Sequence, residues 1–176
     1  MTPTPEWLQE RLFERRLVFV TGRLDDARAA QAAAQIMTLD ASGDAPIDVV
    51  LDSGDGTLEA AFALIDVVDA AHATVRVQCQ GRVIGPAIGV AAAADRRSAS
   101  PHTTFRLTAP GTELSGTPDS IAAQSEQHRL LLWRFQARLA KATGRPTEDS
   151  ADDMRRGRYL DAREALEYGL IDAIRS

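Results

Sequence analysis

The stretch from Gly81 to Gly89 constrains the fold of this chain more than any other part of the sequence. An alternating run from Thr74 to Cys79 precedes it, and an unbroken apolar segment follows it until Asp95. The alternation predicts a strand, the closely spaced glycines predict a tight turn, and the apolar segment predicts a buried helix. Pro86 suits the first position of that helix, where a backbone N–H is not needed.

Many hydrolases hold their nucleophile at such a turn, because the sharp bend exposes the nucleophile and the helix N-terminus points at the reacting group. Here the bend holds Gly85, which has no side chain that could attack a substrate. The sequence therefore predicts the architecture of a catalytic turn without its chemistry.

The order of the predicted elements indicates an α/β fold. Strands, helices and again strands alternate as in βαβ units with right-handed crossovers. The nearly continuous apolar strand at 47–51 is typical of a parallel sheet that is covered on both faces. We expect one domain over residues 1–176, with a disordered start at 1–5 and a long helix at about 119–143. The other predicted helices are at 6–14, 25–39, 58–71 and 86–94, and the other predicted strands at 17–20, 74–79, 104–107 and 170–174.

Composition fits a globular protein of this kind, with 44% hydrophobic and 26% charged residues. The net charge of −5 gives no indication of a nucleic-acid or anionic-membrane partner. The single cysteine, Cys79, excludes an intrachain disulfide, and no run has the apolar character of a secretion signal or a membrane span. We therefore expect a cytoplasmic protein.

The C-terminal segment from Tyr159 to Asp172 is the most specific motif. Asp161 and Glu164 form a predicted capping box, and Gly169 is the predicted left-handed residue that ends the helix. This segment resembles the C-terminal signature of the Clp protease proteolytic subunit, the ClpP family. Four further stretches resemble the family's first strand, its Asn-Ser-Pro-Gly-Gly turn, its nucleophile turn and its long handle helix, at residues 15–22, 52–57, 81–95 and 120–145.

The resemblance implies a ClpP/crotonase-like fold of β-β-α and βαβ units with a protruding handle helix. It also implies seven-membered rings that stack in pairs and are closed by AAA+ unfoldases. When the serine protease triad of the family is transferred position by position, the serine falls on Gly85, the histidine on Thr108 and the aspartate on Gly157. Acyl transfer needs a nucleophile, a base and a group that orients the base, and none of these positions supplies one.

The resemblance places the backbone donors of the oxyanion hole near Gly56 and at Pro86. Proline has no N–H to donate, and the loss of one such donor costs about 10²–10³ in rate. These are four independent departures from the family's site, and a single misaligned residue does not account for them. They favour a catalytically inactive member of the family.

The other residues with reactive side chains have structural interpretations. Three histidines are expected in surface or loop positions rather than as bases: His72, His102 and His128. Ser53 is expected to bond the backbone of its turn, and Cys79 to be a small core residue. Asp52 and Asp55 lack the further ligands that a metal site needs, so we expect no metal and no cofactor.

Four apolar side chains on the first helix and the handle are expected to be exposed for subunit contacts: Trp7, Leu8, Trp133 and Phe135. Arg155 and Arg156 match a region that forms ion pairs between rings in the family, so they are predicted interface residues as well. Only residues 1–5 precede the first helix, and we expect the family's axial-loop segment to be truncated.

The sequence thus predicts a catalytically inactive ClpP-like subunit with a structural or regulatory role. We expect a homo-oligomer or a hetero-oligomer with ClpP paralogues, with an AAA+ unfoldase as a candidate partner. Two alternatives stay open. One is a crotonase-like enzyme acting on an acyl-CoA thioester, against which Pro86 argues. The other is a residual Clp-type serine peptidase that uses a nonstandard group.

Overall fold

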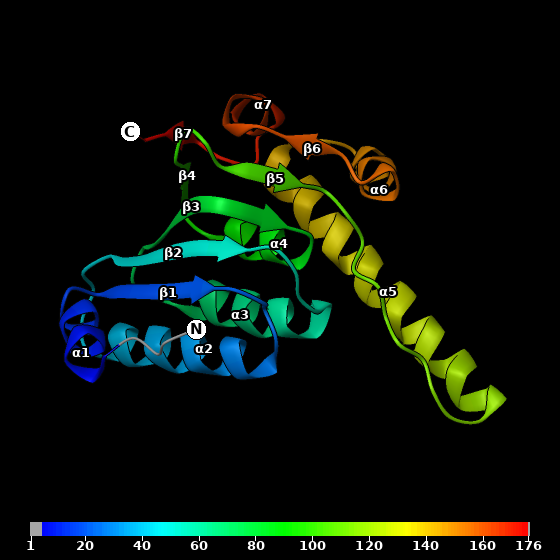
Figure 1. The fold of residues 1–176 in the computed structure, drawn as a ribbon, viewed down its shortest axis with the longest axis horizontal. Helices are drawn as coiled ribbons and strands as arrows, with labels where there is room; N and C mark the ends of the chain where they lie inside the picture. The colour runs from blue at the N-terminus through cyan, green and yellow to red at the C-terminus, as the bar shows by residue number, and fades with distance from the viewer. Residues whose placement is uncertain (1–4, 176) are drawn as a thin grey trace.

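The computed structural model describes residues 5–175, which form one mixed sheet with helices packed around it (Figure 1). The helices are α1 (Glu6–Glu14), α2 (Asp26–Ala41), α3 (Leu58–Ala70), α4 (Pro86–Ala93), α5 (Pro118–Thr143), α6 (Thr147–Arg156) and α7 (Ala162–Tyr168). The strands are β1 (Leu17–Thr21), β2 (Ile47–Ser53), β3 (Val75–Ile84), β4 (Arg96–Ala99), β5 (Thr104–Arg106), β6 (Tyr159–Leu160) and β7 (Ala173–Ile174). Of the predicted disordered start, all but Pro5 lies outside the described residues.

The sheet has the strand order β1-β2-β3-β4-β7, and all of these neighbours are parallel. Strand β5 pairs in parallel with the last part of β3, and β6 pairs antiparallel with β5. The predicted α/β fold with βαβ units is therefore confirmed.

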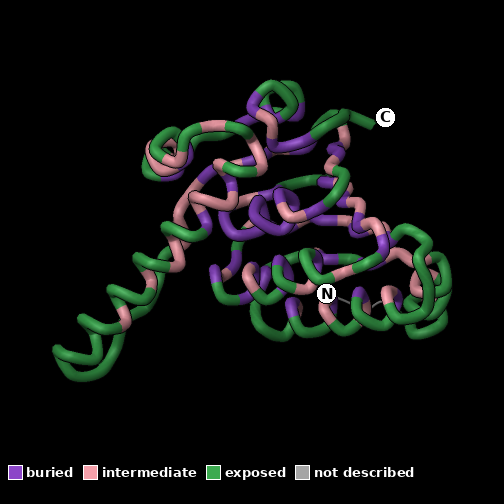
Figure 2. The backbone as a smooth tube through the Cα atoms, turned by 180° about the vertical axis from the view of Figure 1, so that it is seen from behind, coloured by how far each residue is buried: buried purple, intermediate pink, exposed green. Residues whose placement is uncertain are grey.

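Helices α2, α3 and α4 cover one face of the sheet, and the side chains between the two layers form the core (Figures 1 and 2). Helix α4 is apolar all round and nearly every residue in it is buried. Strand β2 alternates between buried and half-buried residues instead of being buried on both faces. The prediction of a sheet covered on both faces is therefore wrong for this strand, whose second face carries Asp48, Val50 and Asp52.

Strand β3 is longer than the predicted strand at 74–79, because it continues through Gly81 to Ile84. Leu51 of β2 is level with Cys79, but Ser53 is level with Val83, so β3 bulges between these two pairs. Gly81 has a φ of +54° there, and a Cβ atom on it would lie 2.7 Å from a carboxylate oxygen of Asp52. Glycine at this position lets the Asp52 side chain fill the bulge and accept the Arg82 N–H at 3.0 Å.

The handle helix α5 begins one residue before the predicted start, and its amino-terminal half extends away from the sheet together with the segment that precedes it (Figure 1). Thr117 caps its first turn by accepting the Ser120 N–H, and Gly144 ends it in the left-handed conformation. Figure 2 shows that the projecting half is exposed, whereas the other half lies against α4 and α6. Within residues 5–175, no helix combines the length and the apolar character that crossing a bilayer requires.

The C-terminal segment confirms the capping box of Asp161 and Glu164, whose side chains each accept the other's backbone N–H. Gly169 ends α7 with a φ of +89°. The predicted strand at 170–174 is shorter, because only Ala173 and Ile174 are in β7. The N–H of Leu170 instead donates to the carbonyl oxygen of Ala165, which closes the end of the helix and withdraws that donor from the sheet.

Candidate functional site at the Gly85 turn

The turn between β3 and α4 is built by the backbone of Gly85. Its φ of +57° and ψ of −119° lie outside the regions that side-chain-bearing residues adopt readily. The Gly85 N–H donates to the Arg106 carbonyl oxygen of β5 at 3.0 Å, and its own carbonyl accepts the Ile88 N–H. Pro86 occupies the first helical position, as predicted. The sharp strand-to-helix bend that a nucleophile would need is therefore present and buried.

Thr108 lies beside this bend. A Cβ atom built on Gly85 would meet the Thr108 carbonyl oxygen at 3.3 Å and its Cγ2 atom at 3.6 Å. Gly157 reaches the same region through the antiparallel pairing of β5 and β6, where the Leu107 N–H donates to the Arg158 carbonyl oxygen at 2.8 Å. The structure thus brings Gly85, Thr108 and Gly157 to neighbouring positions near the carboxyl ends of β3 and β5, where α/β folds place their sites.

Arg106 is a residue of this region that the sequence analysis missed. Its Nε donates to the Gly157 carbonyl oxygen at 3.4 Å, and its guanidinium lies 4.9 Å from the centre of the Tyr159 ring. A Cβ atom on Gly157 would lie 3.0 Å from Arg106 Nη2. A fixed cation therefore occupies the space into which an acidic side chain at position 157 would extend. The outward alternation of Arg106 beside the buried Phe105 was the available sequence signal.

The turn after β2 supplies the second set of backbone groups. Ser53 is buried and its hydroxyl donates to the Asp55 carbonyl oxygen at 2.9 Å, as predicted. The N–H of Gly56, the predicted oxyanion donor, donates to Asp55 Oδ1 at 2.8 Å, and Asp55 Oδ2 pairs with Arg23. Leu24 packs against Gly56 so closely that a Cβ atom on Gly56 would lie 2.7 Å from the Leu24 carbonyl oxygen. A side-chain carboxylate of the chain itself therefore accepts the Gly56 hydrogen bond.

The residues that could replace the missing catalytic groups lie elsewhere. His72 and His102 are exposed, the first beside Asp40 at 3.3 Å and the second before the amino end of β5. His128 is half-buried on α5. Cys79 is buried, and burial raises the pKa of its thiol to about 12, so the thiolate is scarcely populated at neutral pH. Residues 5–175 hold no cluster of three or more His, Cys, Asp or Glu side chains suited to a metal ion.

The predicted interface residues differ in how far their side chains are exposed to solvent. Trp7 and Trp133 are 65% and 59% exposed, and Leu8 is half-buried. Phe135 is fully buried, so the prediction that it is exposed for subunit contacts is wrong. Its ring packs between Gly89 of α4 and Phe62 of α3 and thereby joins the core of its own chain.

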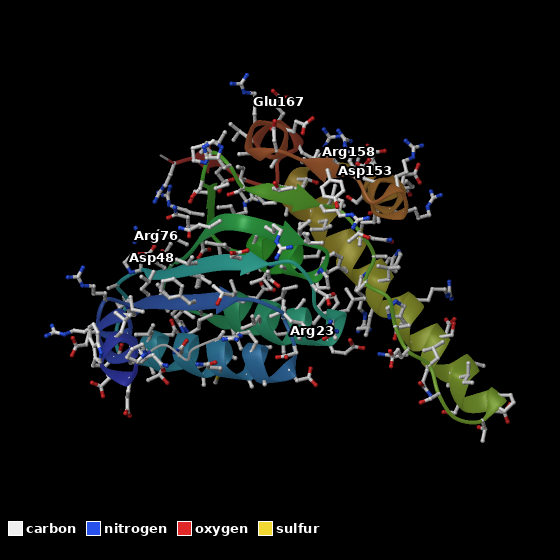
Figure 3. All side chains as sticks on the ribbon, viewed as in Figure 1. Arg23, Asp48, Arg76, Asp153, Arg158 and Glu167 are labelled. Carbon is white, nitrogen blue, oxygen red and sulfur yellow. The ribbon has the colours of Figure 1, made fainter. Side chains whose placement is uncertain are left out.

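Arg155 and Arg156 are exposed on α6. Arg155 pairs with Asp152 one turn earlier in the helix. The neighbouring Asp153 instead faces inward, where it accepts from the Tyr168 hydroxyl at 2.8 Å and pairs with Arg158 (Figure 3). The outward arginines are therefore not needed to hold α6 in place and remain accessible.

The fold and the Gly85 turn define a protein of the ClpP/crotonase-like α/β class. The sequence profile of the family described as Clp protease matches residues 6–176. The chain is 32% identical over 162 residues to an ATP-dependent Clp protease proteolytic subunit of Paracoccus denitrificans, covering 91% of this chain and 81% of the relative. It is 31% identical over 171 residues to proteolytic subunit 3 of Rhodococcus jostii (strain RHA1), covering 95% and 84% of the two chains. The chain belongs to the Clp protease family.

Proposed function

We propose that this chain is a catalytically inactive ClpP-like subunit with a structural or regulatory role. The observation that carries the proposal is the content of the Gly85 turn. The backbone there has the bend of a nucleophile turn, but Gly85, Thr108 and Gly157 bring no nucleophile, no base and no acid to it. A hydrolase of this kind needs all three roles to be filled by side chains within hydrogen-bonding reach.

The state of the two predicted oxyanion donors supports the same proposal. Pro86 has no N–H, and the Gly56 N–H already donates to Asp55. Stabilisation of a developing oxyanion depends on free donors held in place before the reaction. The positions that would attack a substrate and the donors that would stabilise the resulting negative charge are therefore both altered. The same loss argues against a crotonase-like reaction on an acyl-CoA thioester.

We propose that the subunit assembles into seven-membered rings, alone or together with active Clp protease subunits in the cytoplasm, and that an AAA+ unfoldase is a candidate partner of the assembly. Exposed side chains on α1, α5 and α6, which bury few of their own residues, support this assembly. Trp133 lies on the handle helix, Trp7 on α1, and Arg155 and Arg156 on α6. Large apolar side chains exposed on a projecting helix are typical of an association surface.

The test combines activity with mass measurement. The purified protein is incubated with fluorogenic peptides and with a fluorophosphonate probe, and then measured by native mass spectrometry alone and with an active Clp proteolytic subunit. We expect no peptide cleavage, no labelled serine, and ring-sized or mixed species. Stoichiometric labelling of one serine would overturn the inactive assignment, and monomers in both samples at micromolar concentration would overturn the assembly. Co-purified coenzyme A would instead support the thioester alternative.

A further inference from the structure

A hollow of about 390 Å³ lies over the half-buried face of β2 and β3, opposite the face whose side chains form the core with α2, α3 and α4. Six charged residues line it, and we call it the arginine hollow: Asp48, Arg76, Arg96, Arg97, Asp172 and Arg175. Asp48 and Arg76 are near the amino ends of β2 and β3, whereas the Gly85 turn follows the carboxyl end of β3. The hollow is therefore separate from the candidate site.

The strand register explains why positive charge gathers there. Asp48, Arg76 and Arg96 are level with one another on three adjacent parallel strands, so their side chains share a face. Arg76 donates through two nitrogens to the two Asp48 oxygens, at 2.7 and 2.6 Å (Figure 3). Its neighbour on the other side is Arg96, which brings a second positive charge to the same face of the sheet.

Both carboxylates of the hollow are already engaged. Asp172 accepts from Arg97 Nη2 at 2.7 Å and from the Arg97 backbone N–H at 2.8 Å, and Asp48 is held by Arg76. Arg96 and Arg175 form no ion pair with any residue in the range 5–175. Four arginines against two aspartates give the hollow a net charge of +2, in a chain whose net charge is −5.

We propose that the arginine hollow binds a small molecule that carries an oxyanion group, either a carboxylate or a phosphate. Arg96 and Arg175 donate to the oxyanion, and the negative charge of the ligand offsets the excess positive charge of the hollow. Guanidinium groups match the planar geometry of carboxylate and phosphate oxygens and are less strongly hydrated than ammonium groups. The volume lies within the range of about 300–1,000 Å³ that small-molecule sites occupy.

The experiment titrates the full chain with two probes, succinate and inorganic pyrophosphate, by isothermal calorimetry at low ionic strength. We expect saturable binding of at least one probe, weakened by added salt because the contact is electrostatic. Binding of succinate alone identifies a carboxylate site, and binding of pyrophosphate alone identifies a phosphate site. The absence of saturable binding by both probes overturns the proposal.

Matched variants assign the binding to the hollow. Arg96→Gln/Arg175→Gln should weaken binding at least tenfold. The affinity of Arg96→Lys/Arg175→Lys should lie between that of the glutamine pair and that of the unaltered protein, because lysine keeps the positive charge but lacks the paired N–H donors of the guanidinium group. Arg134→Gln/Arg163→Gln removes the same charge from two exposed arginines outside the hollow and should leave binding unchanged. If both glutamine double variants weakened binding equally, net charge alone would explain the effect and the proposal would be overturned.

Discussion

The ring of Phe135 fills the space beside Gly89, so that the handle helix is fixed to the helix that follows the Gly85 turn. A Cβ atom on Gly89 would overlap this ring. Phe135 also meets Phe62 edge to face, with ring centres 6.4 Å apart. The orientation of α5 therefore depends on the absence of a side chain at Gly89 of α4. The position of every group on the projecting half of α5 depends on it as well.

Gly89→Ala should therefore destabilise the protein. Forcing an added methyl group into a packed core costs about 1–3 kcal/mol in the free energy of unfolding. Phe135→Leu leaves room for that methyl group, so the same Gly89→Ala change should cost less in the Phe135→Leu background. Urea denaturation of the four proteins of this cycle measures the coupling. Equal costs in the two backgrounds would show that Phe135 is not what excludes a side chain at position 89.

Gly85→Ser alone should remain inactive toward peptides. The new side chain is strained by the positive φ of residue 85 and also needs a small shift of Thr108, and its hydroxyl gains no base there. Adding Thr108→His and Gly157→Asp supplies the missing groups, but the new carboxylate emerges beside the Arg106 guanidinium. Adding Pro86→Met should then raise the rate further, because it restores an N–H whose loss costs about 3 kcal/mol in the transition state.

The measurement is fluorogenic peptide cleavage by the single, triple and quadruple variants, with the unaltered protein as the baseline. Brisk cleavage by Gly85→Ser alone would mean that an unrecognised base already lies beside the turn. The assignment of positions 108 and 157 would then be wrong. A rate in the quadruple variant below that of the triple variant would contradict the role given to Pro86.

Trp133→Gln should weaken assembly of the subunit. The side chain is 59% exposed on α5, so its removal costs the folded monomer little, whereas an interface would lose a large apolar contact. Native mass spectrometry across a concentration series should show dissociation at a higher concentration than for the unaltered protein. Leu166→Gln, at an exposed apolar residue of α7, is the matched control and should leave the oligomer unchanged.

Tyr168 should make the stability of the fold sensitive to high pH. Burial, followed by the hydrogen bond to Asp153, raises the pKa of Tyr168 from 10.0 to about 12. The folded state therefore favours the neutral phenol. Its contribution to the free energy of unfolding is fully present below pH 10 and is lost as the pH rises toward 12. Urea denaturation between pH 9 and 12 should show this loss, with a smaller decline in Tyr168→Phe.

Cys79 contributes with the same sign, because burial raises the pKa of its thiol from 9.0 to about 12. Its part of the loss begins near pH 9 and continues toward pH 12, so Cys79→Ala should remove the decline between pH 9 and 10 and reduce the decline between pH 10 and 12. Tyr159→Phe, at an exposed tyrosine, is the control. An unchanged decline in Tyr168→Phe would show that the phenol is not the titrating group.

Features that depend on neighbours in the sequence were predicted well. Asp25 caps α2, Pro86 opens α4, and Asp161 with Glu164 forms the capping box, because each of these contacts spans three residues or fewer. Helix α6 and strands β4 and β6 were missed. Strands β4 and β6 are short and their pairing partners are distant in the sequence, and helix α6 is strongly charged.

The burial of Phe135 could have been predicted from the helical spacing of the apolar residues around it. Phe135 shares one helical face with Leu131 and Leu139, four residues away on each side, and that face is the one turned toward the core. Trp133 lies off this face and is exposed. The bulge of β3 at Gly81 could not be read in the same way, because it arises from the register with β2. The contact of Asp55 with the Gly56 N–H depends on the conformation of one turn, which residue types alone do not determine.

The contact between Asp55 and the Gly56 N–H means that a side chain of the turn after β2 competes with any external anion for this N–H. Any oxyanion that approaches the Gly56 N–H must displace a carboxylate attached to the adjacent residue, and Arg23 holds this carboxylate from the other side. A dissolved anion pays the entropy of immobilisation, whereas the Asp55 group is confined to the turn before any ligand arrives. In this structure the Asp55 carboxylate thus occupies the N–H of Gly56, the predicted oxyanion donor, and removal of this carboxylate is the step that would free the N–H.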